Sequence, residues 1–274
     1  MVKNVFKRLT MHIIKILCFV ICINGFAFAS EFEQIKNLAK QGDATAQLKL
    51  GTLYDSGLTW VEKDINKALH WYRESAKQGQ AVAQFNLGNM YEKGQGVTQD
   101  YKQSVYWYLK AAEQGNSEAQ HNLGVIYENG KGVAQDYKQA FNWYLKAAEQ
   151  GETVAQYNLG NMYAKGKGVE QDNKEAYKWW RKVADQGDAW AQYNLGNMYF
   201  FGQGVQQNDT KAVNWYRKSA DQGNSWAQYN LGVMLEKGRG VPRDEKQAIS
   251  WYRKSASQGF SSARTRLLKL SKLF

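Results

Sequence analysis

The stretch Ala191-Gln192-Tyr193-Asn194-Leu195-Gly196-Asn197-Met198-Tyr199 decides the fold, because the Leu-Gly pair at its centre recurs along the chain. The pair begins at Leu50, Leu87, Leu123, Leu159, Leu195 and Leu231, so the step is 37 residues once and 36 residues thereafter. A fixed period of this length indicates tandem copies of one supersecondary unit. We predict six copies over residues 43–79, 80–115, 116–151, 152–187, 188–223 and 224–259, with a C-terminal cap over 260–274.

The third copy shows why each unit is expected to begin with a helix. Asn116 is a favourable N-cap, and Ala119, Leu123 and Tyr127 form an apolar stripe at helical spacing. A glycine follows the central leucine, where we expect another backbone to approach closely. Gly130 and a second glycine two residues later can take the positive φ of a turn, so the helix ends there.

A second helix is predicted in the other half of the same copy. Asp136 can cap it, as can the equivalent Asp or Asn of every copy, and Gly151 can end it. Its predicted buried stripe consists of Ala140, Trp143, Ala147 and Ala148. The tryptophan of this stripe recurs in each copy, and we interpret that column as core. Each copy is thus a helical hairpin that cannot bury both stripes alone, so the copies must stack into an all-α solenoid.

The first 29 residues have the pattern of a secretory signal peptide. Basic residues come first, an apolar run starts at Ile16, and Ala27 and Ala29 are the small residues expected before cleavage at Ser30. The run is shorter than the roughly 18 residues of a membrane span. We predict secretion across the inner membrane to the periplasm or the exterior, with membrane contact only through the transient signal peptide. An uncleaved anchor is the alternative.

Composition excludes several kinds of chemistry from the mature part. Removal of residues 1–29 takes away both cysteines and four basic residues but no acidic ones, so the net charge falls from +11 to +7. Thiol catalysis, disulfides and cysteine metal sites are then excluded. His70 and His121 are far apart and have no local metal-ligand motif. We expect no metal, no cofactor and no nucleic-acid ligand. The lysine columns are expected to form solvated helix faces, whose positive excess could attract acidic partners, anionic lipid heads or cell-wall polymers.

The repeated segments resemble the Sel-one-like repeat family, a relative of tetratricopeptide repeats. The resemblance rests on residues 191–199, on Phe201-Gly202-Gln203-Gly204-Val205, and on Lys211-Ala212-Val213-Asn214-Trp215-Tyr216, and it extends over about residues 31–274. It implies a right-handed α-α superhelix with terminal capping helices that acts through its surfaces, commonly as an adaptor or scaffold. Secreted bacterial members are often linked to envelope assembly or to binding host proteins.

The resemblance also implies where a protein or peptide partner binds, because first helices line the groove in the tetratricopeptide architecture. The corresponding residues of the fifth copy are Trp190, Tyr193, Asn194, Asn197, Phe200 and Phe201. Neighbouring copies contribute Tyr157, Asn158, Asn161, Trp226, Tyr229 and Asn230. Asn amides suit a bound peptide backbone and rings supply rigid contact area. The alternative is that the rings fill space between copies and the Asn side chains satisfy neighbouring turns.

The fifth and sixth copies favour the binding interpretation for their own rings. Trp190, Phe200, Phe201 and Trp226 stand where other copies have smaller or charged residues such as Val82. If that face is in contact with solvent, an exposed apolar patch results, and such patches usually mark interaction sites. The sequence alone does not identify the oligomeric state.

An enzyme is the competing class. Nearly every polar residue recurs with the period, as a structural role demands, so we predict no catalytic residue. His121 departs from the Tyr or Phe of its column, and Glu118 lies three residues before it, so a His-carboxylate pair is conceivable. The alternative function is binding or hydrolysis of a β-lactam, which the resemblance implies for a cysteine-rich branch of the family. The absence of mature cysteines argues against that branch.

Overall fold

The computed structural model describes residues 28–58 and 60–270, which form two compact units. Residues 28–119 and 131–133 belong to the first unit, and residues 120–130 and 134–270 belong to the second. The predicted signal peptide, residues 1–29, lies almost entirely outside the described residues; positions 28 and 29 are the start of a helix over residues 28–40. No helix among the described residues is long and apolar enough to cross a membrane.

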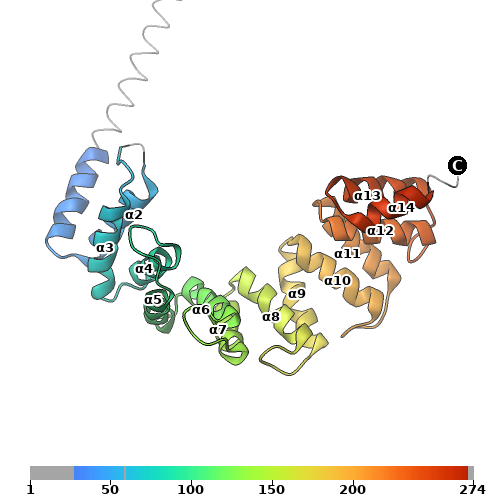
Figure 1. The fold of residues 1–274 in the computed structure, drawn as a ribbon, viewed down its shortest axis with the longest axis horizontal. Helices are drawn as coiled ribbons and strands as arrows, with labels where there is room; N and C mark the ends of the chain where they lie inside the picture. The colour runs from blue at the N-terminus through green and yellow to red at the C-terminus, as the bar shows by residue number, and fades with distance from the viewer. Residues whose placement is uncertain (1–27, 59, 271–274) are drawn as a thin grey trace, which may run out of the picture. The chain divides into compact units, whose positions relative to one another are not determined.

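The described residues form helices and turns and contain no strand (Figure 1). After the helix over 28–40, the first unit continues with α2 (Ala44–Ser56), α3 (Ile65–Lys77), α4 (Ala81–Lys93) and α5 (Tyr101–Glu113). Helix α6 (Ser117–Asn129) begins in the first unit and lies mostly in the second. The second unit continues with α7 (Tyr137–Glu149), α8 (Thr153–Lys165), α9 (Asn173–Asp185), α10 (Ala189–Phe201), α11 (Asp209–Asp221), α12 (Ser225–Lys237), α13 (Glu245–Ser257) and α14 (Ser261–Leu270). The all-α solenoid of helical hairpins is confirmed.

The helix ends follow the predicted caps. Asp136 accepts hydrogen bonds from the backbone N–H groups of Lys138 and Gln139, at 2.9 and 3.0 Å from Oδ1. The same column caps the other second helices, through Asp64, Asp100, Asp172, Asn208 and Asp244. Gly130 has a φ of +68°, a conformation that glycine adopts without the steric penalty of a Cβ atom.

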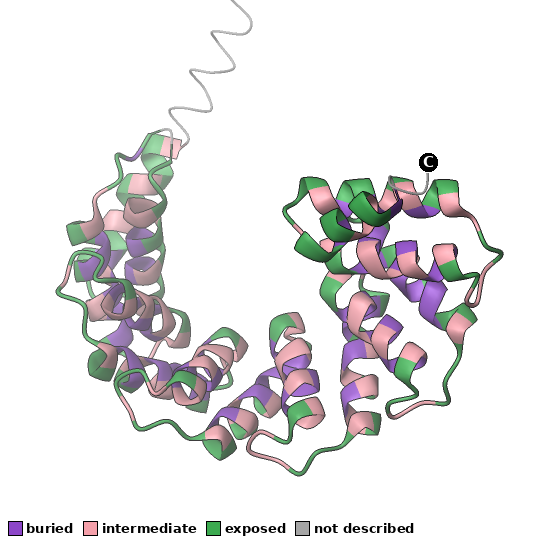
Figure 2. Ribbon diagram, turned by 45° about the vertical axis from the view of Figure 1, so that its right-hand side comes forward, coloured by how far each residue is buried: buried purple, intermediate pink, exposed green. Residues whose placement is uncertain are grey.

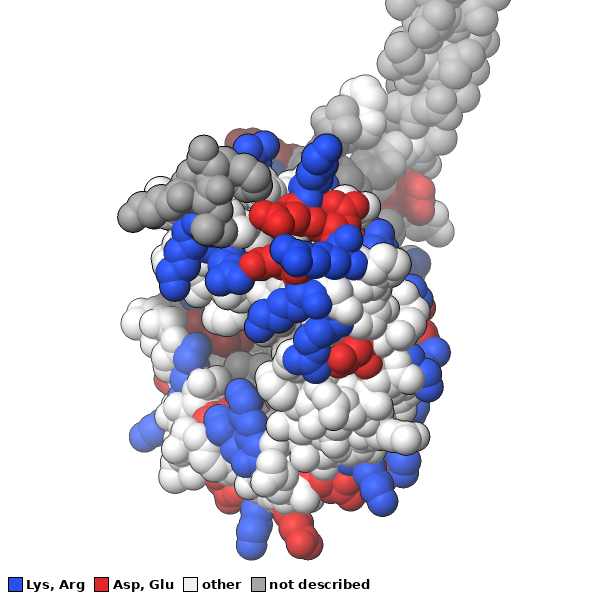
Figure 3. All heavy atoms as spheres, turned by 90° about the vertical axis from the view of Figure 1, so that its right-hand side faces the viewer, with Lys and Arg blue, Asp and Glu red and all other residues white. Residues whose placement is uncertain are grey.

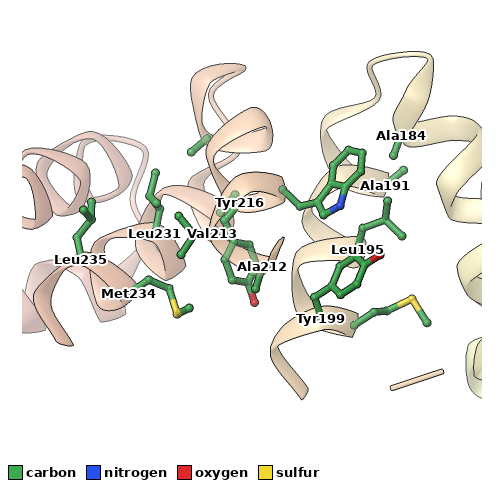
Figure 4. Close-up of a cluster of buried hydrophobic side chains, with 14 of the residues drawn as sticks. Ala184, Ala191, Leu195, Tyr199, Ala212, Val213, Tyr216, Leu231, Met234 and Leu235 are labelled. Atoms are coloured by element: carbon green, nitrogen blue, oxygen red, sulfur yellow. The ribbon is translucent and has the colours of Figure 1, made fainter. Parts of the chain in front are cut away.

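Each hairpin closes around one aromatic ring that lies on the glycine of the Leu-Gly pair. A Cβ atom placed on Gly196 would lie 2.4 Å from the ring of Tyr216, and one on Gly160 would lie 2.4 Å from Trp180. The prediction of a close backbone approach at this glycine is wrong, since a side chain occupies the space. Tyr216 is 1% exposed and belongs to a core that links α9 to α14 (Figure 4).

The tryptophan column is not the core column that the sequence predicts. Five of its six members, Trp143 among them, are half-buried, and Trp215 is the one that is buried, at 8% exposed. The residue that follows the tryptophan is buried in every copy. The two positions lie at i+3 and i+4 from the same buried alanine, and both spacings fall on one helix face, so periodicity does not separate them. A lysine covers the tryptophan instead: Lys146 Nζ lies 4.3 Å from the Trp143 ring centroid and Lys254 Nζ lies 4.0 Å from that of Trp251.

Buried glutamines connect consecutive copies. Gln192 Nε2 donates to the carbonyl of Ala184 in the preceding copy at 3.2 Å, and Gln192 Oε1 accepts from Gln222 of its own copy at 2.9 Å. Gln228 repeats both bonds with Ala220 and Gln258. Buried residues accordingly lie on the helix faces that pack together, and the connecting turns are largely exposed (Figure 2).

Candidate functional site

The first helices of the second unit expose large aromatic side chains, as the sequence predicts. Trp190 and Phe201 on α10 are 50% and 63% exposed, and Trp226 on α12 is 48% exposed. The opposite face of α10 is buried, with Ala191 and Leu195 fully covered. These three rings therefore present apolar area to solvent on two helices whose other sides form the core.

The exposed indoles belong to a continuous row of rings. Tyr193 lies between them, with its ring centroid 6.1 Å from that of Trp190 and 6.4 Å from that of Trp226. The row continues to Phe260, whose centroid is 4.8 Å from Trp226 and 5.2 Å from Tyr229. The tilted and edge-on ring pairs hold the exposed indoles in fixed positions.

Phe260 is a member of this row that the sequence analysis missed. It occupies the column of first-helix N-caps, where the preceding copies have Asn116, Glu152, Asp188 and Asn224. At the start of the C-terminal cap, an apolar ring replaces the capping residue, and this replacement is visible in the sequence. Helix α14 begins without that side-chain cap and gains a ring that extends the row instead.

A pocket of about 480 Å³ opens beside Trp190. Its lining is mainly apolar and comes from α8, α9 and the start of α10: Thr153, Val154, Tyr157, Val183, Asp188 and Trp190. Tyr157 and Trp190 are predicted site residues, whereas the other four are not. At the position of Val183 the other copies have Ser or Ala: Ser75, Ala111, Ala147, Ser219 and Ser255. The larger side chain in the fourth copy is a departure from the repeat that is visible in the sequence.

The hydrogen bonds around this pocket also depart from the repeat. In other copies a glutamine at the end of the second helix donates to the buried glutamine of the first helix. In the fourth copy Gln186 Oε1 accepts from the hydroxyl of Thr153 at 2.9 Å, and Gln156 Oε1 is buried with no hydrogen-bond partner. Burial raises the pKa of Tyr157, so its hydroxyl keeps its proton to a higher pH than an exposed tyrosine does and can donate a hydrogen bond.

Phe200 and Phe201 have different surroundings although they are adjacent. The guanidinium of Arg239 lies 4.4 Å from the Phe200 ring and is held by two hydrogen bonds to Asp209, at 3.1 and 3.0 Å. Phe201 has no such cover, and both rings line a small cavity of about 70 Å³ beside Asn230. Phe201 is therefore available for contacts, whereas Phe200 is largely packed.

The predicted Asn residues connect copies. Asn194 Nδ2 donates to the Tyr157 hydroxyl at 3.4 Å, and Asn230 Nδ2 donates to Asn197 Oδ1 at 3.5 Å. Asn197 Oδ1 also accepts from the Tyr216 hydroxyl at 2.7 Å. These bonds favour the structural interpretation of those Asn side chains, while the exposed rings are not explained by it. Asn158 and Asn161 are half-buried on α8, as are Tyr193 and Tyr229 on their helices.

His121 lies among amides. Its Nδ1 is 3.2 Å from Asn122 Oδ1, and its Nε2 is 3.4 Å from Asn158 Nδ2. The described residues contain no group of three or more His, Cys, Asp or Glu side chains able to hold a metal ion. The contacts of His121 thus fit the interpretation as a polar aromatic residue between two copies.

The chain belongs to the Sel1 repeat family. The Sel1 repeat matches residues 44–80, 81–116, 117–152, 153–188, 191–224 and 227–260. Sel1 repeat proteins are typically protein-interaction scaffolds and are generally non-catalytic. No curated protein matches the chain.

Two solved structures are similar in both sequence and fold. A protective antigen present in uropathogenic Escherichia coli strains, which displays an SLR fold, is 38% identical with a TM-score of 0.75 over 87% of this chain. This chain covers 59% of the length of that antigen. A Sel1 repeat protein from Oxalobacter formigenes is 35% identical with a TM-score of 0.68, over 84% of this chain and 93% of the other.

Proposed function

We propose that this protein is a non-catalytic scaffold that binds a protein or peptide partner on the face formed by its first helices. The observation that carries the proposal is the row of rings from Trp190 to Phe260, in which two indoles are about half exposed. Exposed Trp and Tyr side chains held by their neighbours lose little entropy on binding and are enriched in interface hot spots. The family's typical role as an interaction scaffold supports the same conclusion.

The pocket beside Trp190 suits an apolar side chain of the partner. Val154, Val183 and the two rings of Tyr157 and Trp190 give it apolar walls, and Thr153 and Asp188 place polar groups at its edge. A partner residue entering this pocket would bury an exposed indole face and release the water on it. The Tyr157 hydroxyl and the half-buried Asn side chains are within the same face and can meet the backbone of the bound chain.

The location that we propose is the periplasm or the cell exterior, after secretion across the inner membrane. The support is the signal-peptide pattern of residues 1–29 together with the cysteine-free remainder of the chain. The E. coli relative is a protective antigen, which supports a place accessible from outside the cell. A role in envelope assembly or in host interaction follows from that location.

Affinity capture with the purified protein tests the binding proposal. The wild type and a Trp190→Ala/Trp226→Ala variant are compared as baits, with Trp143→Ala as a matched control that removes an indole from a second helix. We expect a partner that the wild type and Trp143→Ala retain and that the double variant loses. Circular dichroism establishes that each bait is folded, and retention of the partner by a folded double variant would reject the site.

Activity towards a chromogenic β-lactam tests the non-catalytic assignment. The purified protein is expected to give no hydrolysis above the buffer rate, because the polar groups near His121 are amides and no nucleophile is paired with it. Hydrolysis that His121→Ala abolishes would replace the scaffold proposal with an enzyme.

A further inference from the structure

A second pocket of the second unit lies on the side formed by the second helices. It has a volume of about 500 Å³ and is lined by residues of α9, α10 and α11. Its lining includes the cations Arg181, Lys211, Arg217 and Lys218 and a single carboxylate, Asp221. This concentration of positive charge is distinct from the mixed surface at the C-terminal end of the unit, where basic and acidic side chains lie next to each other (Figure 3).

Aromatic rings hold three of the cations in place. Trp215 is 8% exposed and lies between Arg181 and Lys218, whose charged groups are 5.1 and 4.4 Å from its ring centroid. Lys211 Nζ lies 5.3 Å from the ring of Tyr199. A cation over an aromatic face keeps its charge, so these contacts order the side chains without neutralising them.

Most of the positive charge in the pocket is unpaired. Arg181 forms an ion pair with Asp185, with 2.7 Å between Nε and Oδ2. Within the described part of the chain, Lys211, Arg217 and Lys218 form no ion pair. Like charges gathered in one hollow repel one another, and an anion placed among them relieves that repulsion.

The charge cluster depends on one departure from the repeat, at Lys211. At the position of Lys211 the other copies have Gln103, Gln139, Glu175 and Gln247, except for Lys67 in the first copy. Lys67 is neutralised by Asp64 at 2.9 Å. The position of Arg217 is leucine in the second and third copies and arginine in the others, and the position of Lys218 is lysine in every copy except the first. Only the junction between the fourth and fifth copies combines an unpaired lysine on one side with two arginines and a second lysine.

We propose that this pocket binds an acidic segment of a partner protein, whose carboxylate side chains meet Lys211, Arg217 and Lys218. Phosphate sites usually gather several donors, often backbone N–H groups, around one ion. Here the donors are side chains spread around a hollow of about 500 Å³, which fits several carboxylates along a peptide. The rings of Trp215 and Tyr199 offer apolar contact to the same segment. This site lies apart from the first-helix face and extends the proposed function to a second surface.

Fluorescence anisotropy with a fluorescein-labelled hexaglutamate peptide tests the inference. The pocket variant Lys211→Gln/Arg217→Leu carries residues that other copies already have at these positions, so it is expected to fold. The control Lys246→Gln/Arg253→Leu removes the same charge from α13, outside the pocket. We expect the pocket variant to lose about tenfold or more in affinity and the control less than about twofold.

Three outcomes would overturn the proposal. Equal losses in the two variants would mean that the peptide follows net charge alone. Displacement of the peptide by 1 mM inorganic phosphate would assign the pocket to small anions. The absence of any wild-type binding at low salt, where charge attraction is strongest, would remove the site altogether.

A gain-of-function variant gives an independent readout. Asp244→Asn/Gln247→Lys places a lysine at the next junction, where Arg217, Arg253 and Lys254 occupy the equivalent positions. The cap is changed to the Asn that precedes Lys211, because Asp244 would otherwise pair with the new lysine as Asp64 pairs with Lys67. The expected result is a rise in stoichiometry from one peptide to two, measured by titration at a protein concentration well above the dissociation constant. An unchanged stoichiometry would contradict the assignment of Lys211 as the residue that decides binding.

Discussion

The second helices of the second unit cover their tryptophans, whereas the first helices leave theirs open. On α7, α9, α11 and α13 the lysine three residues after each tryptophan lies over the indole, at distances between 4.0 and 4.4 Å from the ring centroid. On α10 and α12, Trp190 and Trp226 pair with other rings and remain about half exposed. Aromatic side chains are therefore abundant throughout the unit, but large ones are exposed to solvent only on the first-helix face of its described residues.

The largest expected loss of stability is that of removing Tyr216, the ring that lies between the two faces. Tyr216→Ala empties a site that is 1% exposed and packed on Gly196, so we expect a loss of about 3–5 kcal/mol in the free energy of unfolding. Urea denaturation monitored by circular dichroism measures it. Tyr216→Phe removes only the hydroxyl bond to Asn197 and should cost about 1 kcal/mol. Similar losses in both variants would show that the ring itself contributes little.

The second prediction compares the stability cost of removing one tryptophan from each face. Trp215→Ala removes a ring held between two cations, and we expect it to cost about 3 kcal/mol in unfolding free energy. Trp190→Ala removes an exposed ring and should cost under about 1 kcal/mol. The same denaturation experiment applies to both. If Trp190→Ala proves as damaging as Trp215→Ala, the first-helix face is part of the core and the comparison fails.

Acid should weaken the C-terminal end, where an ion pair joins α12 to α14. Glu236 on α12 accepts hydrogen bonds from Arg266 and from the Tyr252 hydroxyl, and the Arg266 guanidinium holds the pKa of Glu236 below its ordinary value. A lowered folded-state pKa stabilises the fold above the unfolded value of about 4.5, and this stabilisation is lost as the pH falls through the lower folded value.

Thermal unfolding across that acidic range measures this contribution. Exposed carboxylates such as Asp244 also have lowered pKa values, so the informative quantity is the difference between the wild type and Glu236→Gln. We expect a difference of about 1 kcal/mol near neutral pH that shrinks below pH 4. A difference that is constant with pH would exclude the ion pair as its cause.

The smallest expected loss of stability is that of removing a lysine from the face of a second-helix tryptophan. Lys254→Gln removes the ammonium group from the face of Trp251 and should cost about 0.5–1 kcal/mol. Lys49→Gln on α2 removes one exposed lysine charge as a matched control and should be neutral within error. Indole fluorescence provides a second readout, because uncovering a ring changes its contact with solvent. No difference between the two variants would mean that the lysines cover the rings without stabilising them.

The repeat period and the capping residues were enough to predict the helical hairpins and their order. Six Leu-Gly pairs and a column of Asp and Asn residues were sufficient for hairpins in the right order, because each signal acts within about one helix turn of its partner. The assignment of the core ring failed because Trp143 and Tyr144 are adjacent and both fall on the inward half of the helix. The packing partner across the hairpin, Gly124, decides which of them is buried, and that contact is made between helices.

Only part of the candidate site could be predicted from the sequence, because the rest depends on contacts between helices. Exposed rings at Trp190 and Trp226 were found as departures from their columns. Val183 and Phe260 are departures too, but their meaning depends on a pocket and a ring row that form only when neighbouring copies stack. Lys211 likewise becomes informative only beside Arg217 of its own copy and Arg181 of the copy before.

The glutamine bonds between copies have a consequence for how such a gene can change in length. Gln192 and Gln228 each reach back to the same carbonyl of the preceding copy and forward to the same amide of their own. After deletion or duplication of one complete 36-residue segment, each buried glutamine therefore still meets an equivalent carbonyl and an equivalent amide. A change by a partial segment would leave a buried glutamine amide without hydrogen-bond partners. Recombination between copies can therefore lengthen or shorten the array in whole steps, because each new junction contains the same glutamine bonds.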